Sequence, residues 1–230
     1  ERANYNSLLR FYQASIKKLG STDAASSTPH VLEALLRLRQ AASHPGLVDK
    51  ARSHEASSKV EFLIEKLRGL AEEGHKALVF SQFTSLLAIV RERLTAEGIG
   101  FAYLDGKTKD RNACVAQFQT APEQSVFLIS LKAGGVGLNL TAADYVFILD
   151  PWWNPAVEAQ AIDRAHRIGQ TRHVIAYRLL ARNTVEERVA QLQDQKRELV
   201  AAIMGTEGAF AGRLTRGDME SLLGLTDASI

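Results

Sequence analysis

Three side chains with a spacing suited to phosphate binding lie close together near the middle of the second half of the chain. Gln160 and Arg164 are four residues apart, and Arg164 and Arg167 are three apart. A helix over residues 155–167, which the sequence predicts, would place all three on one face. Two guanidinium groups on one face can hold a multiply charged phosphate through paired hydrogen bonds. The spacing therefore predicts a phosphate clamp.

The charge around this segment bears on that interpretation. In most helices, arginines at this spacing belong to a solvated face, here with Asp163 or Glu158 as ion-pair partners. Residues 160–178, however, contain four arginines against one aspartate, a local net charge of +3. The whole chain has a net charge of only +2. This concentration of positive charge favours an anionic ligand.

A second candidate segment is rich in glycine. Glycines at positions 134, 135 and 137 follow Lys132. Glycine allows a backbone to approach a phosphate or ribose closely, and the lysine adds a point charge. A tight turn between a strand and a helix explains the same residues equally well. The segment matches neither of the two common glycine-rich nucleotide fingerprints, G-x-G-x-x-G and G-x-x-x-x-G-K-[ST].

Both segments require a scaffold of alternating strands and helices. Five short apolar runs predict strands at residues 77–80, 101–104, 126–130, 145–149 and 174–179. Helical patterns lie between them, over about 84–96, 109–119 and 155–167. The alternation predicts an α/β fold with an open parallel sheet, and the near-continuous hydrophobicity predicts strands covered on both faces. Ligands bind such sheets at the carboxyl ends of the strands.

Helical segments are predicted on both sides of this sheet in the sequence. We expect three parts: a helical segment over residues 1–75, the sheet domain over 76–183 and a helical extension over 184–230. Within the flanking parts, the pattern predicts a polar break at 21–29, helices at about 185–204 and 219–224, and a glycine-rich loop at 205–217.

The composition excludes several classes of protein. The chain has 230 residues, of which 46% are hydrophobic and 23% charged, typical of a globular protein of one or two domains. Its one cysteine, Cys114, cannot form an internal disulfide, and with the six histidines it shows no ligand spacing, so we predict no structural metal. No apolar run approaches the roughly 18 residues of a membrane span, and we predict no membrane partner. Because the chain begins with Glu1, we expect it to be part of a longer protein.

Residues 160–170, QAIDRAHRIGQ, resemble motif VI of the Swi/Snf-type ATPases of helicase superfamily two. This string is highly specific for the family, whereas each of the other blocks is weak by itself. Residues 132–140 resemble motif V, and the run DPWWNP at 150–155 joins the two motifs as it does in the family. Weaker blocks follow the family's order from about residue 30 to 200: residues 36–45, 76–83, 103–118 and 177–187.

The resemblance implies a RecA-like fold that forms the second of two lobes. In this family the two lobes bind ATP with magnesium in their cleft and translocate on double-stranded DNA without sequence preference. The phosphate-binding loop and the acidic magnesium motif belong to the first lobe, and this sequence has neither. We therefore expect a C-terminal motor lobe that is inactive alone and monomeric, with the first lobe and double-stranded DNA as partners.

The resemblance also implies roles for single residues. Arg164 and Arg167 would act as arginine fingers on the γ-phosphate, with Gln160 beside them. Nucleotide contacts would come from Gly135, Gly137 and Asn139. Contacts to the DNA backbone would come from Ser81, Gln82, Lys107, Thr108, Lys132 and Trp153. Plainer alternatives stay open for the DNA set: Ser81 and Gln82 end a strand, Lys107 and Thr108 form a turn, and the tryptophans pack in the core.

Two other functions are weighed against this one. The first is a catalytically silent scaffold that binds protein or DNA through the same fold, which would not need both arginines. The second is a dinucleotide enzyme using residues 134–137, which would need the missing fingerprint. The links between the motif blocks are short, and we take this as typical of a bacterial or archaeal member. Such a protein would be cytoplasmic and associated with the nucleoid, whereas a eukaryotic member would be nuclear.

Overall fold

The computed structural model describes residues 1–19, 24–133, 138–195 and 216–225. These residues form two compact units, one made of residues 56–180 and the other of residues 1–55 with 181–230. The division into three domains at residues 76 and 184 stays a prediction. In the structure, the helix that precedes the first strand belongs to the same unit as the sheet.

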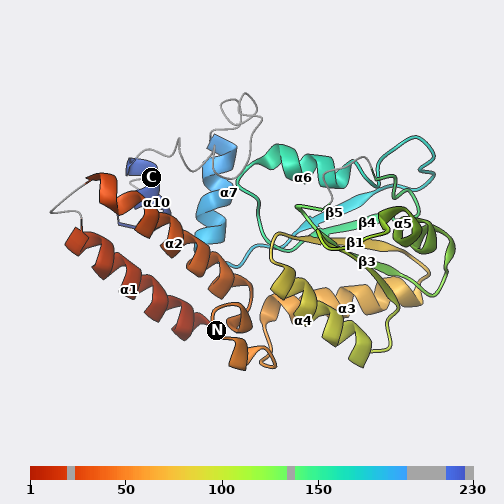
Figure 1. Ribbon diagram of the computed structural model, residues 1–230, viewed down its shortest axis with the longest axis horizontal. Coiled ribbons are helices and arrows are strands. Elements are labelled where there is room, and N and C mark those ends of the chain that lie inside the picture. Colours follow the sequence, from red (N-terminus) through yellow and green to blue (C-terminus); the bar gives the residue numbers. More distant parts are fainter. Residues whose placement is uncertain (20–23, 134–137, 196–215, 226–230) are drawn as a thin grey trace. The chain divides into compact units, whose positions relative to one another are not determined.

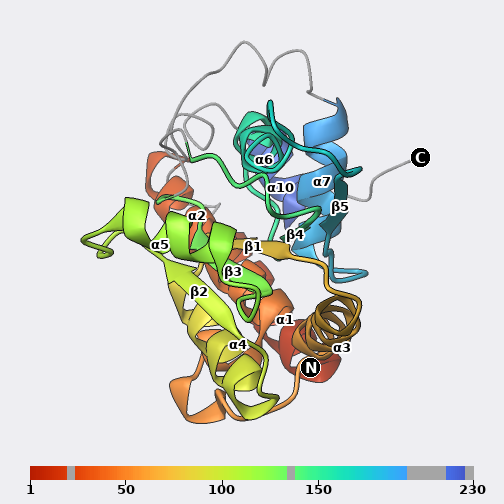
Figure 2. The ribbon, with the colours of Figure 1, turned by 90° about the vertical axis from the view of Figure 1, so that its right-hand side faces the viewer.

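A single sheet of five parallel strands forms the centre of the unit 56–180 (Figure 1). The strands are β1 (Ala77–Ser81), β2 (Phe101–Leu104), β3 (Val126–Ser130), β4 (Tyr145–Ile148) and β5 (Ile175–Arg178). Figure 2 shows their order, β2-β3-β1-β4-β5. The register is set on both sides of β1, where Leu78 lies beside Phe127 of β3 and Val146 of β4. The predicted open parallel sheet is confirmed.

Helices cover both faces of this sheet. On one face, α4 (Thr84–Ala96) packs on β1 and β3, and α3 (Ser58–Glu72) packs against α4. On the other face lie α6 (Pro155–Ile162) and α5 (Arg111–Thr120), which contributes Phe118 to the core there. The connections from β1 and from β4 run in opposite directions along the sheet. In open parallel sheets, ligands bind beside the carboxyl ends of strands at such a change of direction.

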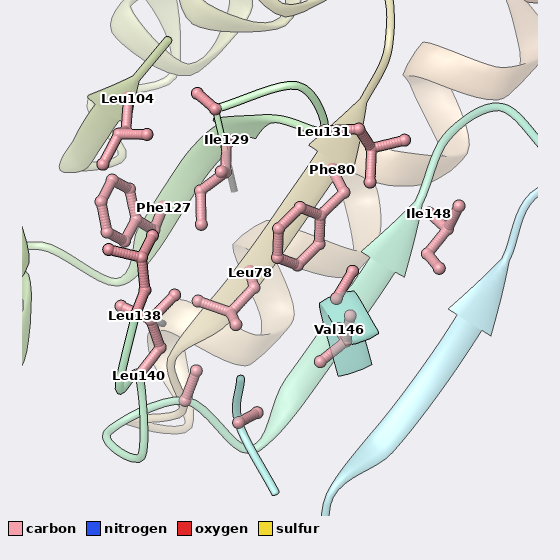
Figure 3. Close-up of a cluster of buried hydrophobic side chains, with 14 of the residues drawn as sticks. Leu78, Phe80, Leu104, Phe127, Ile129, Leu131, Leu138, Leu140, Val146 and Ile148 are labelled. Carbon is pink, nitrogen blue, oxygen red and sulfur yellow. The ribbon is translucent and has the colours of Figure 1, made fainter. Parts of the chain in front are cut away.

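The core under α5 and α6 is built from alternate residues of the central strands (Figure 3). Leu78 and Phe80 of β1 lie between Phe127 and Ile129 of β3 on one side and the β4 residues on the other. Side chains from the connecting segments complete the cluster, among them Leu131, Leu138 and Leu140. Residues 131–133 and 138–140, which follow β3, are thereby anchored by apolar contacts.

The fifth strand differs from the prediction. Three of the four residues of β5 are exposed, with 41% of Ile175 accessible, so the expected cover on both faces is wrong for this strand. The reason is its position at the end of the sheet, where it pairs only with β4. Its apolar sequence is as consistent with a half-exposed edge as with a buried strand.

The other unit is helical. It contains α1 (Arg2–Leu19), α2 (Ala24–Ser43), two short 3₁₀ turns at Pro45–Leu47 and Lys50–Arg52, α7 (Val185–Gln195) and α10 (Arg216–Leu222). Helix α2 packs against α1 and α7. It begins at Ala24, so the polar break predicted at 21–29 is shorter than expected. The last helix begins at Arg216 rather than 219, and the expected continuation of α7 to residue 204 lies outside the described residues.

Two long-range hydrogen bonds join the helices of this unit. The Val185 N–H, at the start of α7, donates to the Tyr5 hydroxyl of α1 at 2.6 Å. The Ser43 hydroxyl, at the end of α2, donates to the buried Glu186 carboxylate at 3.2 Å. Each bond satisfies a polar group that is removed from water. In the described part of the chain, no helix is long and apolar enough to cross a membrane.

Tyr5→Phe tests the first of these bonds. The variant leaves the Val185 N–H without its acceptor, and we expect a loss of about 1–2 kcal/mol in unfolding free energy. Burial raises the pKa of Tyr5 to about 12, above the unfolded value near 10. The neutral phenol therefore stabilises the fold below about pH 10, and this stabilisation is lost as the pH rises towards 12. Urea unfolding across that range should show the difference from Tyr5→Phe shrinking.

Tyr12→Phe is the matched control on the same helix. The Tyr12 side chain is only half-buried, so its unfolding free energy should change by less than about 0.5 kcal/mol. Equal losses in both variants would contradict the assignment of the Val185 bond.

Candidate functional site

Four of the residues predicted to contact DNA follow β1, β2 and β3. Gln82 follows β1, Lys107 and Thr108 follow β2, and Lys132 follows β3. Because the strands are parallel, these loops emerge at the same edge of the sheet. Both lysine side chains are exposed there. The structure thus brings two exposed positive charges to the carboxyl edge.

The loop after β1 is held by a buried carboxylate. The Ser81 hydroxyl donates to Asp150 Oδ1 at 2.5 Å, and the Gln82 N–H donates to Asp150 Oδ2 at 3.2 Å. Ser81 and Asp150 are both 0% exposed. The Ser81 hydroxyl therefore joins two loops and does not reach the surface, and we assign no DNA contact to it. The Gln82 side chain is half-buried.

The loop after β2 is organised by Asp105. Its Oδ1 accepts the Lys107 N–H at 2.8 Å, and its own N–H donates to the Thr108 hydroxyl at 3.0 Å. Thr108 is half-buried by this arrangement, while the Lys107 side chain is exposed to solvent. The turn predicted as the plainer alternative is present, and it presents the lysine.

Both tryptophans are buried. Trp152 belongs to the core cluster under α6, and Trp153 is 6% exposed. The DNA contact predicted for Trp153 does not fit this burial, and we assign none to it. The apolar bulk of an indole explains why it is covered.

Helix α6 begins as the sequence predicts but ends earlier. Asn154 caps it, its Oδ1 accepting the Ala156 N–H at 3.0 Å, and Pro155 occupies the first helical position. The helix ends at Ile162 rather than at 167. Tighter turns follow, in which the Arg164 N–H bonds to the Ala161 carbonyl at 3.3 Å. Arg164 and Arg167 thus lie beyond the helix that carries Gln160.

The two arginines differ in their surroundings. Arg164 is 6% exposed, and its buried Nε has no hydrogen-bond partner among the described residues. Burial, followed by the nearby positive charge of Arg167, lowers the pKa of Arg164. Arg167 is exposed. Two like charges held close together, one of them desolvated, form an arrangement that an anion would stabilise.

The other two arginines of this region are already paired. Arg178 contacts Glu158 at 2.5 Å, and Arg172 contacts Asp144 at 3.1 Å. The local charge of +3 is therefore less concentrated than the sequence indicates. Of the two predicted alternative partners of the clamp, Glu158 pairs with Arg178 instead. The other, the exposed Asp163, attracts Arg164 and opposes the lowering of its pKa.

The turn that carries the arginines lies beside the segment leading into β4. The Leu140 N–H donates to the Arg164 carbonyl at 3.0 Å. Since β4 begins at Tyr145, this contact lies towards the amino ends of the strands, away from the loops that carry Lys107 and Lys132. Gly169, with φ of 105°, closes the turn in a conformation that side chains rarely adopt. The structure therefore separates the arginine turn from the lysine edge.

The predicted nucleotide contacts are only partly described. Gly135 and Gly137 lie outside the described residues, and Asn139 is exposed. Among the residues that the structure does describe, no group of three or more His, Cys, Asp or Glu side chains could hold a metal ion. The donors present at the arginine turn suit a phosphate and not a magnesium ion.

Several residues that organise this site had no signal in the sequence. Asp150, Glu158 and Lys59 are buried polar residues, and Lys59 Nζ donates to the Leu149 carbonyl at 2.8 Å. The partners of Lys59 and Asp150 lie far away in the chain, and the ion-pair partner of Glu158 is Arg178 on β5, so spacing does not reveal them. Asp150 stands in the DPWWNP run, but only the tertiary contact shows what its carboxylate does.

Comparison with known proteins agrees with both the fold and the sequence motifs. A model of the helicase conserved C-terminal domain matches residues 58–169. The chain is 44% identical over 171 residues to the DNA repair protein RAD5B of Arabidopsis thaliana, covering 73% of this chain and 13% of that protein. It is 45% identical over 158 residues to the chromatin-remodeling ATPase INO80 of Neurospora crassa, covering 68% of this chain and 8% of that protein.

Solved structures give the same result. The C-terminal domain of the Sulfolobus solfataricus SWI2/SNF2 ATPase superposes with a TM-score of 0.71 at 28% identity, covering 96% of this chain and 94% of that one. The core of that ATPase in complex with dsDNA gives 0.73 at 29% identity, covering 94% and 47%.

The parallel sheet and the motif order define a C-terminal helicase domain with a RecA-like fold. The chain belongs to the Swi/Snf family and is a C-terminal helicase lobe of that family.

Glu158 offers a test of the polar network beside α6. Its Oε1 accepts the Trp152 N–H at 2.7 Å, and it is 2% exposed. Glu158→Ala leaves that N–H and Arg178 unpaired, and we expect a loss of about 3 kcal/mol. Glu158→Gln keeps an acceptor without a buried charge and should cost about 1 kcal/mol or less at neutral pH. Urea unfolding measures both.

The pH dependence follows from the same burial. Burial raises the pKa of Glu158, while Arg178 opposes the rise. The stabilisation from this group is then present below the unfolded pKa and lost as the pH rises through the folded pKa. The wild type should gain stability relative to Glu158→Gln as the pH falls to about 4. Exposed Glu92→Gln is the control, and the same pH trend there would contradict the assignment.

Proposed function

We propose that this chain is the C-terminal motor lobe of an ATP-dependent translocase on double-stranded DNA. The observation that carries the proposal is the buried Nε of Arg164 on the motif VI turn, which has no hydrogen-bond partner among the described residues and lies near the exposed Arg167. A guanidinium nitrogen that is held out of water without a hydrogen-bond partner favours an incoming phosphate oxygen. The chain spans only 8% to 13% of the two curated relatives, so the activity of the whole protein is part of the proposal.

The proposed chemistry is the hydrolysis of ATP at the face shared with a first lobe. Arg164 and Arg167 act as arginine fingers on the γ-phosphate, and Gln160 lies beside them. Charge spreads over the phosphoryl oxygens in the transition state, where fingers of this kind contribute about 10³–10⁵ in rate. Gly135, Gly137 and Asn139 are the nucleotide contacts that the resemblance to motif V implies. ATP would bring magnesium, whose ligands we place in the first lobe because this chain offers no carboxylate cluster among its described residues.

The proposed DNA interface is the carboxyl edge of the sheet. Lys107 and Lys132 are exposed there, Thr108 lies in the same loop as Lys107, and Gln82 follows β1 at the same edge. The similar ATPase core of Sulfolobus solfataricus was solved in complex with dsDNA, which supports this partner. Lysines that contact phosphates position the duplex without reading its sequence. Separation of this edge from the arginine turn lets ATP and DNA bind at the same time.

Two further points belong to the proposal. The lobe is monomeric. It is inactive by itself because it lacks the first lobe's phosphate-binding loop. Its place in the cell depends on its source. The bacterial or archaeal origin expected from the short links stays a prediction, because the similar proteins come from a plant, a fungus and Sulfolobus solfataricus. A eukaryotic source would place it in the nucleus. The silent scaffold is the competing function, and it requires no role for the arginines.

Arg164→Ala and Arg167→Ala test the finger assignment. In the full-length protein, each variant should lower DNA-stimulated ATP turnover by about 10³-fold or more, because the transition-state charge loses a counter-charge. Turnover at saturating DNA and ATP is the measurement. Arg182→Ala, an exposed arginine outside the sheet unit, should keep wild-type turnover, and the 230-residue chain alone should stay at background. Normal turnover in both finger variants would favour the scaffold.

The lysine edge has its own test. Lys107→Ala and Lys132→Ala should weaken binding of the full-length protein to duplexes of any sequence. Each should reduce the slope of log affinity against log salt by about 0.9, since one phosphate contact is lost. Fluorescence anisotropy at several salt concentrations measures this slope. Lys66→Ala, an exposed lysine on α3, is the control, and an unchanged slope in both edge variants would exclude this interface.

A further inference from the structure

The arginine turn is held by a glutamine at its end. Gln170 Nε2 donates to the Ala165 carbonyl at 3.1 Å and to the Ala143 carbonyl at 2.8 Å, while its Oε1 accepts the Arg172 N–H at 2.9 Å. One side chain thus bonds three backbone groups. Ala165 directly follows Arg164, and Ala143 belongs to the segment before β4.

A second glutamine holds the other side of that segment. Gln119, on α5, donates from Nε2 to the Asn139 carbonyl at 3.0 Å and accepts the Ala142 N–H on its Oε1 at 2.8 Å. Between these two bonds, the Leu140 N–H reaches the Arg164 carbonyl at 3.0 Å. The end of α5 is itself fixed, because Lys76 Nζ donates to the Phe118 and Ala121 carbonyls at 2.5 and 2.7 Å.

An amide side chain suits this task because it carries a donor and an acceptor on one rigid group. Residues 139–143 form neither helix nor strand, so their backbone groups lack the regular partners that a ladder would supply. The two glutamines supply those partners from either side. The backbone of Arg164 is then tied to the rest of the unit through Ala165, through Leu140 and through both glutamines.

We propose that Gln170 and Gln119 are positioning residues that set the location of the Arg164 guanidinium relative to the nucleotide. The proposal rests on the finger role proposed for Arg164. Neither glutamine is assigned a contact with ATP, and both act through the backbone on which the arginine stands. Misplacing a catalytic group by about 1 Å can cost about 100-fold in rate. Loss of the hydrogen bonds from either glutamine should therefore lower the rate of ATP hydrolysis.

Glutamate substitutions isolate the hydrogen bonds from the packing. Gln170→Glu keeps the shape and the acceptor for the Arg172 N–H, but its carboxylate turns an oxygen towards two carbonyls. In the full-length protein at about pH 8, we expect kcat to fall about 10- to 100-fold while KM for ATP changes less than about threefold, because a finger acts in the transition state. Gln119 reaches Arg164 only through the further hydrogen bond between the Leu140 N–H and the Arg164 carbonyl. For Gln119→Glu we therefore expect a smaller loss of kcat, about 3- to 10-fold.

Protonation supplies the rescue. A carboxyl that faces carbonyl oxygens has a raised pKa, and its protonated form regains a donor. The ratio of kcat in Gln170→Glu to kcat in the wild type should therefore rise as the pH falls from about 8 to about 6. A merely structural role would lower the melting temperature and the folded fraction, with kcat per folded molecule unchanged at every pH.

Gln117→Glu provides the matched control, since it is an exposed glutamine on the same helix as Gln119 and undergoes the same charge change. Its kcat should equal that of the wild type. Amide hydrogen exchange adds a readout independent of turnover. Leu140, which shares its peptide group with the Asn139 carbonyl, should exchange faster in Gln119→Glu and should keep wild-type protection in the control.

The outcomes separate this proposal from the function on which it rests. Wild-type kcat in both Gln170→Glu and Gln119→Glu, together with a strong loss in Arg164→Ala, would overturn the positioning role and leave the finger role intact. Normal turnover in Arg164→Ala would overturn the finger role itself. Unchanged exchange at Leu140 in Gln119→Glu would show that the glutamine does not hold the segment.

Discussion

The parallel pairing of β1 with β3 on one side and β4 on the other is the constraint on which the rest of the unit depends. Strands that run in one direction release their following loops at one edge, so residues separated widely in sequence meet there. Ser81 and Asp150 are 69 residues apart and share a hydrogen bond for this reason. The same geometry gathers Lys107 and Lys132. A change in strand order would scatter these loops even if each were unchanged.

Burial of polar groups at this edge follows from the pairing. A covered sheet end has carbonyls, a serine hydroxyl and carboxylates with little access to water, and each needs a partner. Lys59, Asp150 and Glu158 supply those partners from different elements. Such a network is costly to break because it leaves a buried group unsatisfied. It fixes the loop after β1 and the start of α6 relative to each other.

The arginine turn is held in place differently from the loops at the carboxyl edge. It stands at the end of a short helix and beside a segment without regular structure, so its position comes from single hydrogen bonds, one of them between backbone groups, and not from a ladder. The buried Arg164 remains without a partner for its Nε within the described residues. A lobe of this family built in this way has its charged turn and its lysine edge at separate places, joined by the rigid sheet between them.

Sequence patterns located the elements well, because the periodicity of apolar residues is a local property. The strands fall where the apolar runs predict, the helix at Thr84–Ala96 matches its predicted range, and the QAIDRAHRIGQ string identified the family. The chain order of motifs was likewise readable without a structure. Local chemistry also predicted the start of α6 at Asn154 and Pro155.

Only the tertiary structure decided which side chains are accessible. The sequence does not show that Ser81 and Trp153 are buried, that Arg178 pairs with Glu158, or that α6 ends at Ile162. Those outcomes depend on partners that the fold brings from distant positions, and burial and hydrogen bonding are properties of that proximity. The roles of Gln119 and Gln170 are of the same kind: a glutamine carries no signal of its own until the fold places two backbone groups within its reach.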